Sequence, residues 1–313
     1  MAALPFPPGL MLAGPTAAGK SEVALLLARR LSGEIVSVDS MQVYRGMDVG
    51  TAKPTVEERQ SVRHHLIDVV DCSEAFDAAR FVSLAEGILR EVADRRRLPI
   101  LCGGTGLYFK ALLEGIGDAP SSDPDLRSAL EKTPLPALLQ ELAEKDPQTF
   151  QHIDRKNPRR VVRAVEVLRL TGRPHSQQKA VWDHANENAA RETSPVFVLR
   201  RGSDDLQARI NIRVERMFAS GLVDETRRLL GLGLEQNRTA MQAIGYRQVA
   251  EHLRGMRSLP ETIELVKTKT RQFAKRQMTW YRRQLPVCWI DVAKEEPAGS
   301  VADRIQVEFE RIK

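Results

Sequence analysis

Short apolar runs alternate along this chain with longer segments in which apolar residues recur every three or four positions. The short runs are typical of strands that are buried on both faces of a parallel sheet, and the longer segments are typical of amphipathic helices. Strands are predicted at residues 10–13, 34–40, 64–71, 98–102, 196–199 and 287–290. The pattern therefore predicts an α/β fold with a parallel sheet core flanked by helices.

The helical segments divide the chain into three regions. Between the strands, helices are predicted at residues 21–31, 76–97, 107–113, 204–220, 223–230, 239–253 and 260–283, with a final helix at the end of the chain. A stretch without strand patterning carries helical segments at 125–132, 136–145, 158–171 and 173–181. We therefore expect residues 1–115 to form the first part of the core, 116–194 a helical insertion domain, and 195–313 the completion of the core.

A phosphate-binding motif lies between the first strand and the first helix. It matches GxxxxGK[ST] and consists of Gly14, Pro15, Thr16, Ala17, Ala18, Gly19, Lys20 and Ser21. Backbone N–H groups of such a loop and the N-terminus of the following helix bind a di- or triphosphate, because both present unpaired donors to an anion. Lys20 would reach the outer phosphates, and the Ser21 hydroxyl would bind Mg²⁺. The motif refines the predicted fold class to an α/β fold with a P-loop NTPase-like core.

Asp39 lies at the C-terminal end of the second predicted strand, at the edge of the sheet where ligands bind in open parallel folds. Three roles remain open for it: a Mg²⁺ ligand of the Walker-B kind, a general base, or a turn cap. Asp68 is a rival Walker-B candidate on spacing alone. The neighbouring His64 and His65 point to opposite faces of a strand, so we do not expect them to bind one ion.

A second strand, glycine turn and helix follows at residues 98–113, with Gly103, Gly104 and Gly106 in the turn. Glycine permits close approach of another chain segment or of a ligand. A tight turn without any partner is the alternative.

The charge distribution suggests a polyanionic partner. The chain has 47 Lys and Arg against 41 Asp and Glu, a net charge of +6. Five cations crowd the N-terminal end of the helix at 158–171, where they oppose the helix dipole and call for a negative partner; they are Arg155, Lys156, Arg159, Arg160 and Arg163. Residues 267–283 contain no acidic residue and interleave cations with Phe273, Trp280 and Tyr281, a pattern that suits nucleic acid.

Composition narrows the class of protein. Three separated cysteines without zinc-type spacing predict reduced thiols, and no run of about 18 apolar residues occurs. We expect a cytoplasmic, monomeric protein without a membrane segment.

Set side by side, six segments resemble the motif series of the bacterial tRNA dimethylallyltransferase family, in the family's order. They are residues 14–21, 37–54, 64–68, 103–108, 243–248 and 272–280. The second segment is more specific than the phosphate loop, which many unrelated enzymes share. The zinc finger that follows the catalytic domain in eukaryotic members has no counterpart here.

The resemblance implies transfer of a dimethylallyl group from dimethylallyl diphosphate to the N6 amine of the adenosine next to the tRNA anticodon, with release of diphosphate. Asp39, Lys20, Thr16 and Arg213 would be catalytic, with Mg²⁺ as cofactor on Ser21. Residues that would contact tRNA are Asp39, Ser40, Met41, Gln42, Thr105, Arg127, Arg159, Arg160, Val161, Val162, Arg163, Gln242, Ala243, Ile244, Gly245, Tyr246 and Arg247. The target base would be flipped out of its loop.

Two other functions fit the residues without the resemblance. A P-loop small-molecule kinase would use Asp39 to activate a hydroxyl and the helical insertion as a lid over ATP. An RNA-binding NTPase would need a residue that positions water, and none is identifiable in the sequence.

Overall fold

The computed structural model describes residues 9–117, 119–178 and 195–312. It divides into two compact units, one comprising Met1–Leu113 with His184–Lys313 and the other Glu114–Asp183. Each unit is described below by itself. The insertion expected at residues 116–194 ends outside the described residues.

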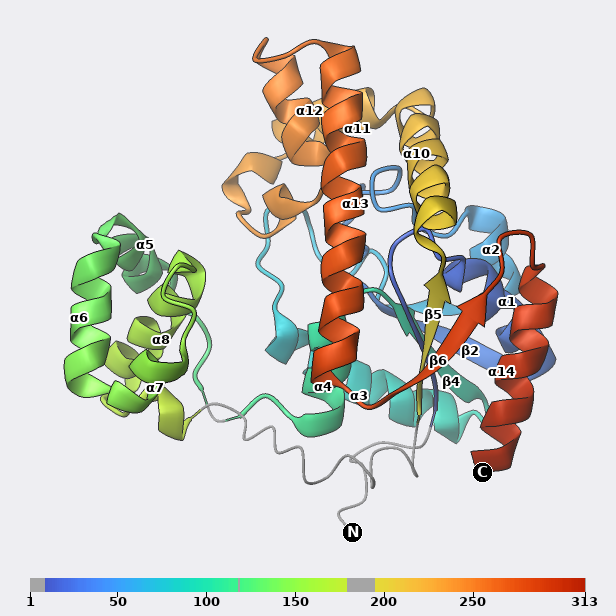
Figure 1. Cartoon of the computed structure of the whole chain (residues 1–313), viewed down its shortest axis with the longest axis horizontal. Helices are drawn as coiled ribbons and strands as arrows, with labels where there is room; N and C mark the ends of the chain where they lie inside the picture. Colours follow the sequence, from blue (N-terminus) through green and yellow to red (C-terminus); the bar gives the residue numbers. More distant parts are fainter. Residues whose placement is uncertain (1–8, 118, 179–194, 313) are drawn as a thin grey trace. The chain divides into compact units, whose positions relative to one another are not determined.

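The larger unit is built on a six-stranded parallel sheet with the order β3-β2-β4-β1-β5-β6 (Figure 1). The strands are β1 (Leu10–Ala13), β2 (Gly33–Val38), β3 (His64–His65), β4 (Leu98–Gly103), β5 (Val196–Arg201) and β6 (Val287–Val292). The α/β fold with a parallel sheet core is confirmed. Because all strands run the same way, the loops that follow β1, β2 and β4 meet at one edge of the sheet.

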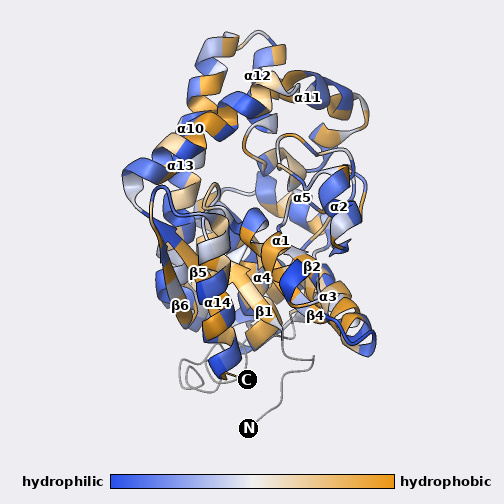
Figure 2. Cartoon of the chain, turned by 90° about the vertical axis from the view of Figure 1, so that its right-hand side faces the viewer, coloured by the Kyte–Doolittle hydropathy of each residue, from blue (hydrophilic) through white to orange (hydrophobic). Residues whose placement is uncertain are grey.

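Both faces of the sheet are covered, which explains the continuous apolar runs. Met11 and Ala13 belong to the core on one face, whereas Leu10 and Leu12 belong to the core on the other. Strand β1 is hydrophobic along its whole length in Figure 2, while the surrounding helices carry both colours. Side chains alternate along a strand, so a strand between two cores has no polar face.

Helices α1 (Lys20–Arg30) and α14 (Ala298–Ile312) pack together on the face of Leu10 and Leu12. The opposite core takes in α3 (Ala78–Asp94), α4 (Gly106–Glu114), α11 (Leu222–Gly231) and α12 (Tyr246–Leu253). Helix α10 (Ser203–Ala219) packs along α13 (Leu259–Gln284) in a smaller cluster. Short 3-10 helices lie at Leu234–Gln236 and Ala240–Gln242.

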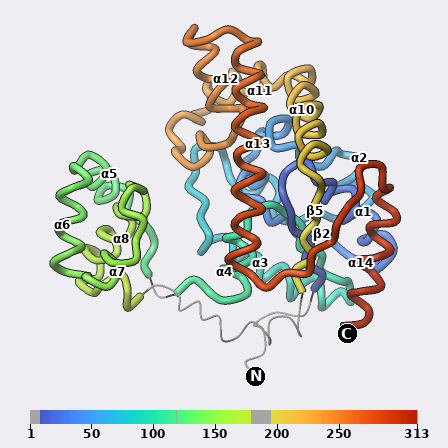
Figure 3. The backbone as a smooth tube through the Cα atoms, in the orientation of Figure 1, coloured from blue at the N-terminus to red at the C-terminus, as the bar shows by residue number. Residues whose placement is uncertain are grey.

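Helix α13 is the longest element and has 26 residues. Ser258 and Glu261 form a reciprocal capping box at its N-terminus. Figure 3 lets the reader follow it from the neighbourhood of α12 to that of α4, where Lys110 donates a 3.0 Å hydrogen bond to the carbonyl oxygen of Gln284. One helix therefore connects the outer helices with the sheet edge.

The smaller unit is helical. It contains α5 (Pro124–Lys132), α6 (Leu135–Lys145), α7 (Pro147–His152), α8 (Pro158–Thr171) and the 3-10 turn His175–Gln177. Leu130, Leu138 and Leu142 pack against Val161 and Val165 of α8.

Several predicted elements are wrong in extent. Only His64–His65 of the strand expected at 64–71 pairs as a strand, because Leu66 and Asp68 have positive φ angles of 59° and 57° and turn the chain. The helix expected at 239–253 is broken at Gly245, whose φ is 105°. Of the helix expected at 173–181, only a 3-10 turn at His175–Gln177 forms among the residues described up to 178, and the rest lies outside the described residues.

Two short helices were not expected. Helix α2 (Val56–Ser61) begins at a capping box formed by Thr55 and Glu58, and α7 begins at Asp146, whose carboxylate accepts from the Thr149 N–H at 3.1 Å. None of the helices that the structure describes combines the length and apolarity needed to span a membrane.

Candidate active site

The phosphate-binding motif adopts a P-loop conformation between β1 and α1. Gly14, Ala17 and Gly19 have φ angles of 145°, 63° and 98°, so the loop turns sharply. No side chain caps the N-terminus of α1. The Lys20 ammonium donates a 2.7 Å hydrogen bond to the Pro15 carbonyl oxygen, and Ser21 lies exposed on the first turn of α1. The loop is thus shaped to receive an anion.

Four ionisable groups gather behind this loop. Burial and the neighbouring positive charge of Arg213 lower the pKa of the Lys20 ammonium to about 8, against the opposing effects of Cys102 and Asp39. Burial also lowers the pKa of Arg213 and raises that of the Cys102 thiol to about 11. The structure therefore brings together Lys20, Arg213 and Asp39, which come from three distant parts of the chain.

Asp39 lies directly after β2, which ends at Val38 and not at residue 40 as predicted. Its Oδ1 accepts a 2.9 Å hydrogen bond from the Met41 N–H, which is an Asx turn. Among the residues that the structure describes, Oδ2 has no hydrogen-bonding partner. Asp39 therefore caps this turn with Oδ1, and its Oδ2 stays available for the other two predicted roles, general base or Mg²⁺ ligand.

The second glycine turn is approached by the chain itself. A Cβ at Gly103 would lie 2.0 Å from the Val38 carbonyl oxygen, and one at Gly106 would lie 2.2 Å from the Trp280 ring of α13. Thr105 Oγ1 accepts a 3.0 Å hydrogen bond from the Ser40 N–H, which ties this turn to the loop of Asp39. Of the two alternatives, close approach is correct, and the partners are β2 and α13.

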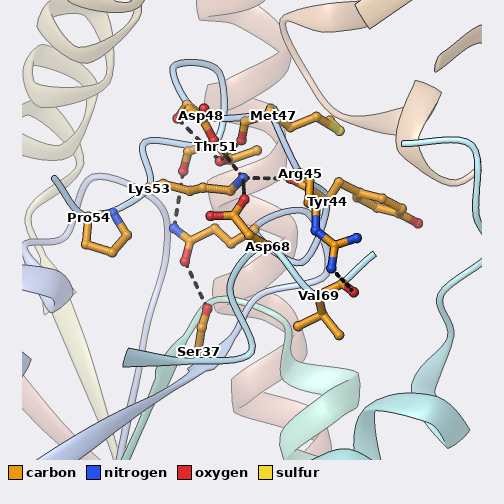
Figure 4. A network of polar contacts seen from close by, with 12 residues as sticks. Ser37, Tyr44, Arg45, Met47, Asp48, Thr51, Lys53, Pro54, Asp68 and Val69 are labelled. Carbon is orange, nitrogen blue, oxygen red and sulfur yellow. Dashed lines mark hydrogen bonds and ion pairs between the residues drawn. The ribbon is translucent and has the colours of Figure 1, made fainter. Parts of the chain in front are cut away.

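The loop after Asp39 is held by an ion network (Figure 4). Lys53, with only 2% of its side chain exposed, forms ion pairs with Asp68 at 2.5 Å and Asp48 at 2.7 Å. Arg59 also pairs with Asp68 at 2.7 Å. Lys53 also donates to the Tyr44 carbonyl oxygen at 2.6 Å. Two cations occupy the Asp68 carboxylate and hold its pKa below the usual range. This occupancy removes Asp68 as a Walker-B candidate.

A second contact, missed by the sequence reasoning, anchors the same loop to α11. The Glu225 carboxylate accepts hydrogen bonds from the N–H groups of Asp48, Val49 and Gly50 at 3.1, 2.9 and 3.2 Å. It also accepts one from the Tyr246 hydroxyl at 2.6 Å. No spacing rule connects Glu225 with residue 48, so only the fold brings them together.

The residues expected to contact tRNA in the larger unit differ in exposure. Ser40, Met41, Gln42 and Thr105 are half-buried around Asp39, and the Ser37 hydroxyl donates to Gln42 Oε1 at 2.9 Å. Residues 242–247 differ among themselves: Gln242 and Arg247 are exposed, Ile244 is half-buried, and Ala243, Gly245 and Tyr246 are buried. The Tyr246 side chain is 0% exposed and serves the contact with Glu225.

In the smaller unit, the cation cluster has an internal anion. Glu166 is 0% exposed, and its carboxylate pairs with Arg163 at 2.7 Å and lies 3.5 Å from Arg127. For Arg163, the expected negative partner is therefore internal and not an external anion. Arg159 and Arg160 are exposed, whereas the side chains of Val161 and Val162 are buried in the core of the unit.

Helix α13 is basic on part of its surface only. Lys267 pairs with Glu215 at 2.7 Å and Glu264 at 2.8 Å, and Tyr281 is fully buried, so neither side chain is open to nucleic acid. An open groove of about 480 Å³ runs along α13 and is lined by Gln272, Lys275, Arg276, Thr279, Trp280, Arg283 and Gln284.

Within the described part of the chain, no three His, Cys, Asp or Glu side chains cluster as a metal site would require. His65 Nε2 is bonded to Glu34 at 2.7 Å and His64 Nδ1 to the Val62 carbonyl at 2.7 Å, so the two rings have separate structural partners.

Residues 42–284 match the family model described as IPP transferase. The chain belongs to this family. The match begins after the P-loop and Asp39 and extends through the smaller unit and α13. It includes the Asp68 network, the Glu225 contact and Arg213.

Similar proteins support the assignment. A tRNA dimethylallyltransferase of Syntrophobacter fumaroxidans is 44% identical over 91% of this chain and 84% of its own length, and one of Pelotomaculum thermopropionicum is 41% identical over 95% of each. The structure resembles a tRNA isopentenylpyrophosphate transferase of Bacillus halodurans, with a TM-score of 0.70, 38% identity and coverage of 97% and 96%. A eukaryotic dimethylallyltransferase acting on tRNA, 23% identical, shares the fold with a TM-score of 0.77 over 97% of this chain and 79% of its own.

Proposed function

We propose that this IPP transferase family member transfers the dimethylallyl group of dimethylallyl diphosphate to the N6 amine of the adenosine next to the anticodon of tRNA. The observation that carries the proposal is the gathering of Lys20, Arg213 and Asp39 at the P-loop, together with the names of relatives that are 41% to 44% identical over at least 90% of the chain.

The P-loop would hold the diphosphate as a leaving group. As the bond between the allylic carbon and the diphosphate oxygen breaks, negative charge builds on the diphosphate, and fixed positive groups stabilise it most where water is excluded. Lys20 and Arg213 would supply these positive groups, and Thr16 lies in the P-loop itself. Both cations are partly desolvated before a ligand binds, so the diphosphate restores an interaction that the protein lacks.

Asp39 would accept the proton that the amine loses. The carbon–nitrogen bond forms as the carbon–oxygen bond breaks, and the amine nitrogen then releases a proton to a base. An adenine amine is a weak nucleophile, and a positioned general base contributes about 10²- to 10⁴-fold. The Asx turn fixes the orientation of the Asp39 carboxylate, with Oδ2 as the proton acceptor.

Mg²⁺ fits this site as a partly protein-bound ion. The Ser21 hydroxyl is exposed at the first turn of α1, and Mg²⁺ commonly keeps waters and substrate phosphate oxygens as its other ligands. When bound, the ion would neutralise charge on the diphosphate.

Contact with tRNA would come from exposed cations and the loops around Asp39. In the smaller unit Arg159 and Arg160 are exposed, and in the larger unit Arg247 and the groove of α13 are exposed. Contacts by Arg127 and Arg163 would have to share these side chains with Glu166. Val161, Val162, Ala243 and Tyr246 would act through the backbone or through packing, since their side chains are buried.

The test is transfer of label from dimethylallyl diphosphate to unmodified tRNA with adenosine next to its anticodon, in Mg²⁺ and without ATP. A parallel reaction measures phosphate release from ATP. Labelled RNA is the expected result. Unlabelled RNA with consumption of ATP would overturn the proposal in favour of a P-loop kinase. A tRNA with guanosine at the acceptor position is the matched control and should stay unlabelled.

A further inference from the structure

The side chain of Gln277, on α13, bridges two loops of the candidate active site. Its Oε1 accepts a 3.0 Å hydrogen bond from the Thr16 N–H in the P-loop. Its Nε2 donates a 2.9 Å hydrogen bond to the Gly104 carbonyl oxygen in the second glycine turn. The amide is 7% exposed, and only one of its two orientations offers a donor to the carbonyl and an acceptor to the N–H.

These two loops would hold opposite sides of the reaction. The P-loop would carry the diphosphate leaving group. The glycine turn continues into Thr105, which accepts from the Ser40 N–H at 3.0 Å and whose own N–H donates to the Val38 carbonyl at 3.1 Å. Asp39 lies between Val38 and Ser40, so Gln277 connects the loop of the leaving group with the loop of the proposed base.

The helix that carries Gln277 packs tightly against these loops. A Cβ at Gly104 would lie 2.5 Å from Gln277 Nε2, and one at Gly106 would lie 2.2 Å from the Trp280 ring. Tyr281, one turn further along α13, is fully buried. The position of the amide is therefore fixed by core packing on both sides and not by a mobile side chain.

We propose that Gln277 is a positioning residue: it sets the separation between the P-loop and the turn at Thr105, and thereby aligns the leaving group with Asp39. The inference rests on the proposed prenyl transfer. Displacement at carbon requires the nucleophile and leaving group to be aligned, and a displacement of about 1 Å can cost about 10²-fold in rate. Among the described residues, no other side chain hydrogen-bonds to both loops.

Two substitutions separate the hydrogen bonds from the volume of the side chain. Gln277→Met keeps the length and removes both hydrogen bonds; kcat should fall about 10- to 100-fold while the Kd values for dimethylallyl diphosphate and tRNA stay within about threefold. Gln277→Glu keeps the acceptor for Thr16 but loses the donor for Gly104 when ionised. Its kcat relative to the native enzyme should recover as pH falls, because the protonated acid again donates to the Gly104 carbonyl.

Gln306 provides the matched control. It lies on α14, and its amide donates to Glu310 on the surface at 2.9 Å. Gln306→Met should leave kcat, both Kd values and the melting temperature unchanged, which shows that the exchange itself is harmless in a helix.

Three results would overturn the inference. Native kcat in Gln277→Met would show that alignment does not need the bridge. A parallel loss of kcat, both affinities and melting temperature would show a purely structural role. A Gln277→Glu variant whose relative kcat does not change with pH would contradict the bridge even where Gln277→Met does not fold. An inactive native enzyme in the same assay would instead refute the proposed function.

Discussion

The lowered pKa of Lys20 leads to a quantitative prediction for diphosphate binding. Burial and the charge of Arg213 lower this pKa to about 8, whereas an unperturbed lysine would stay charged up to about 10.4. If only the ammonium form binds the diphosphate, the apparent affinity for dimethylallyl diphosphate should weaken about tenfold between pH 7 and pH 9, since about nine-tenths of Lys20 is neutral at the higher pH.

Binding should also take up a proton at high pH. A bound diphosphate raises the pKa of Lys20, so about 0.9 proton should enter per ligand near pH 9 and about 0.1 near pH 7. Titration calorimetry in two buffers of different ionisation enthalpy measures this number directly. The folded, unliganded protein binds fewer protons at Lys20 than the unfolded chain between about pH 8 and 10.4, so this group alone makes stability rise with pH through that window.

Two variants assign the titration to Lys20. Lys20→Met should weaken binding and abolish the pH dependence above pH 7. Arg213→Ala should move the break to higher pH, because the charge that lowers the pKa of Lys20 is gone. An affinity that stays constant from pH 7 to 9 in the native protein, with no buffer-dependent heat, would refute the reasoning.

Four further results are expected. Asp39→Asn should lower turnover by about 10² or more with tRNA affinity within a few-fold, and retained turnover would remove Asp39 as the base. Arg159→Glu together with Arg160→Glu should flatten the salt dependence of tRNA binding. An unaltered slope in filter binding would show that neither arginine contacts tRNA phosphates. Glu166→Gln should destabilise the smaller unit by about 2 kcal/mol, because the hydrogen bond from Arg163 loses its charged acceptor; unchanged urea unfolding would contradict this. Gly106→Ala should lower the melting temperature through the 2.2 Å contact with Trp280, whereas Gly231→Ala, with open space around its Cβ, should not.

Much of the fold could be predicted from local pattern. The apolar runs at β1, β2, β4, β5 and β6 gave strands in nearly their observed positions, since a strand covered on both faces must be apolar throughout. The prediction failed at residues 64–71, where an apolar run turns at Leu66 and Asp68. A positive φ angle is unfavourable for leucine, so its side chain gives no reason to predict a turn at that position.

Part of the candidate site followed from sequence in the same way. Gly14, Gly19, Lys20 and Ser21 act within a few residues of each other, so their spacing carries their geometry. Asp39 could be placed because the carboxyl ends of parallel strands share one edge. Its contact with Met41 is local and confirms the turn cap, whereas the roles of general base and Mg²⁺ ligand stay predictions.

The remaining features belong to tertiary structure. Glu225 meets the N–H groups of Asp48 to Gly50, Glu166 meets Arg163 from within a core, and Gln277 meets Thr16 across 261 residues of chain. Periodicity tells which face of a helix is buried, but a buried polar group is recognised only by the partner that satisfies it. The sequence by itself determined most elements and the phosphate loop of this protein, and the packing of α11 and α13 decided which side chains connect the loops of the candidate active site.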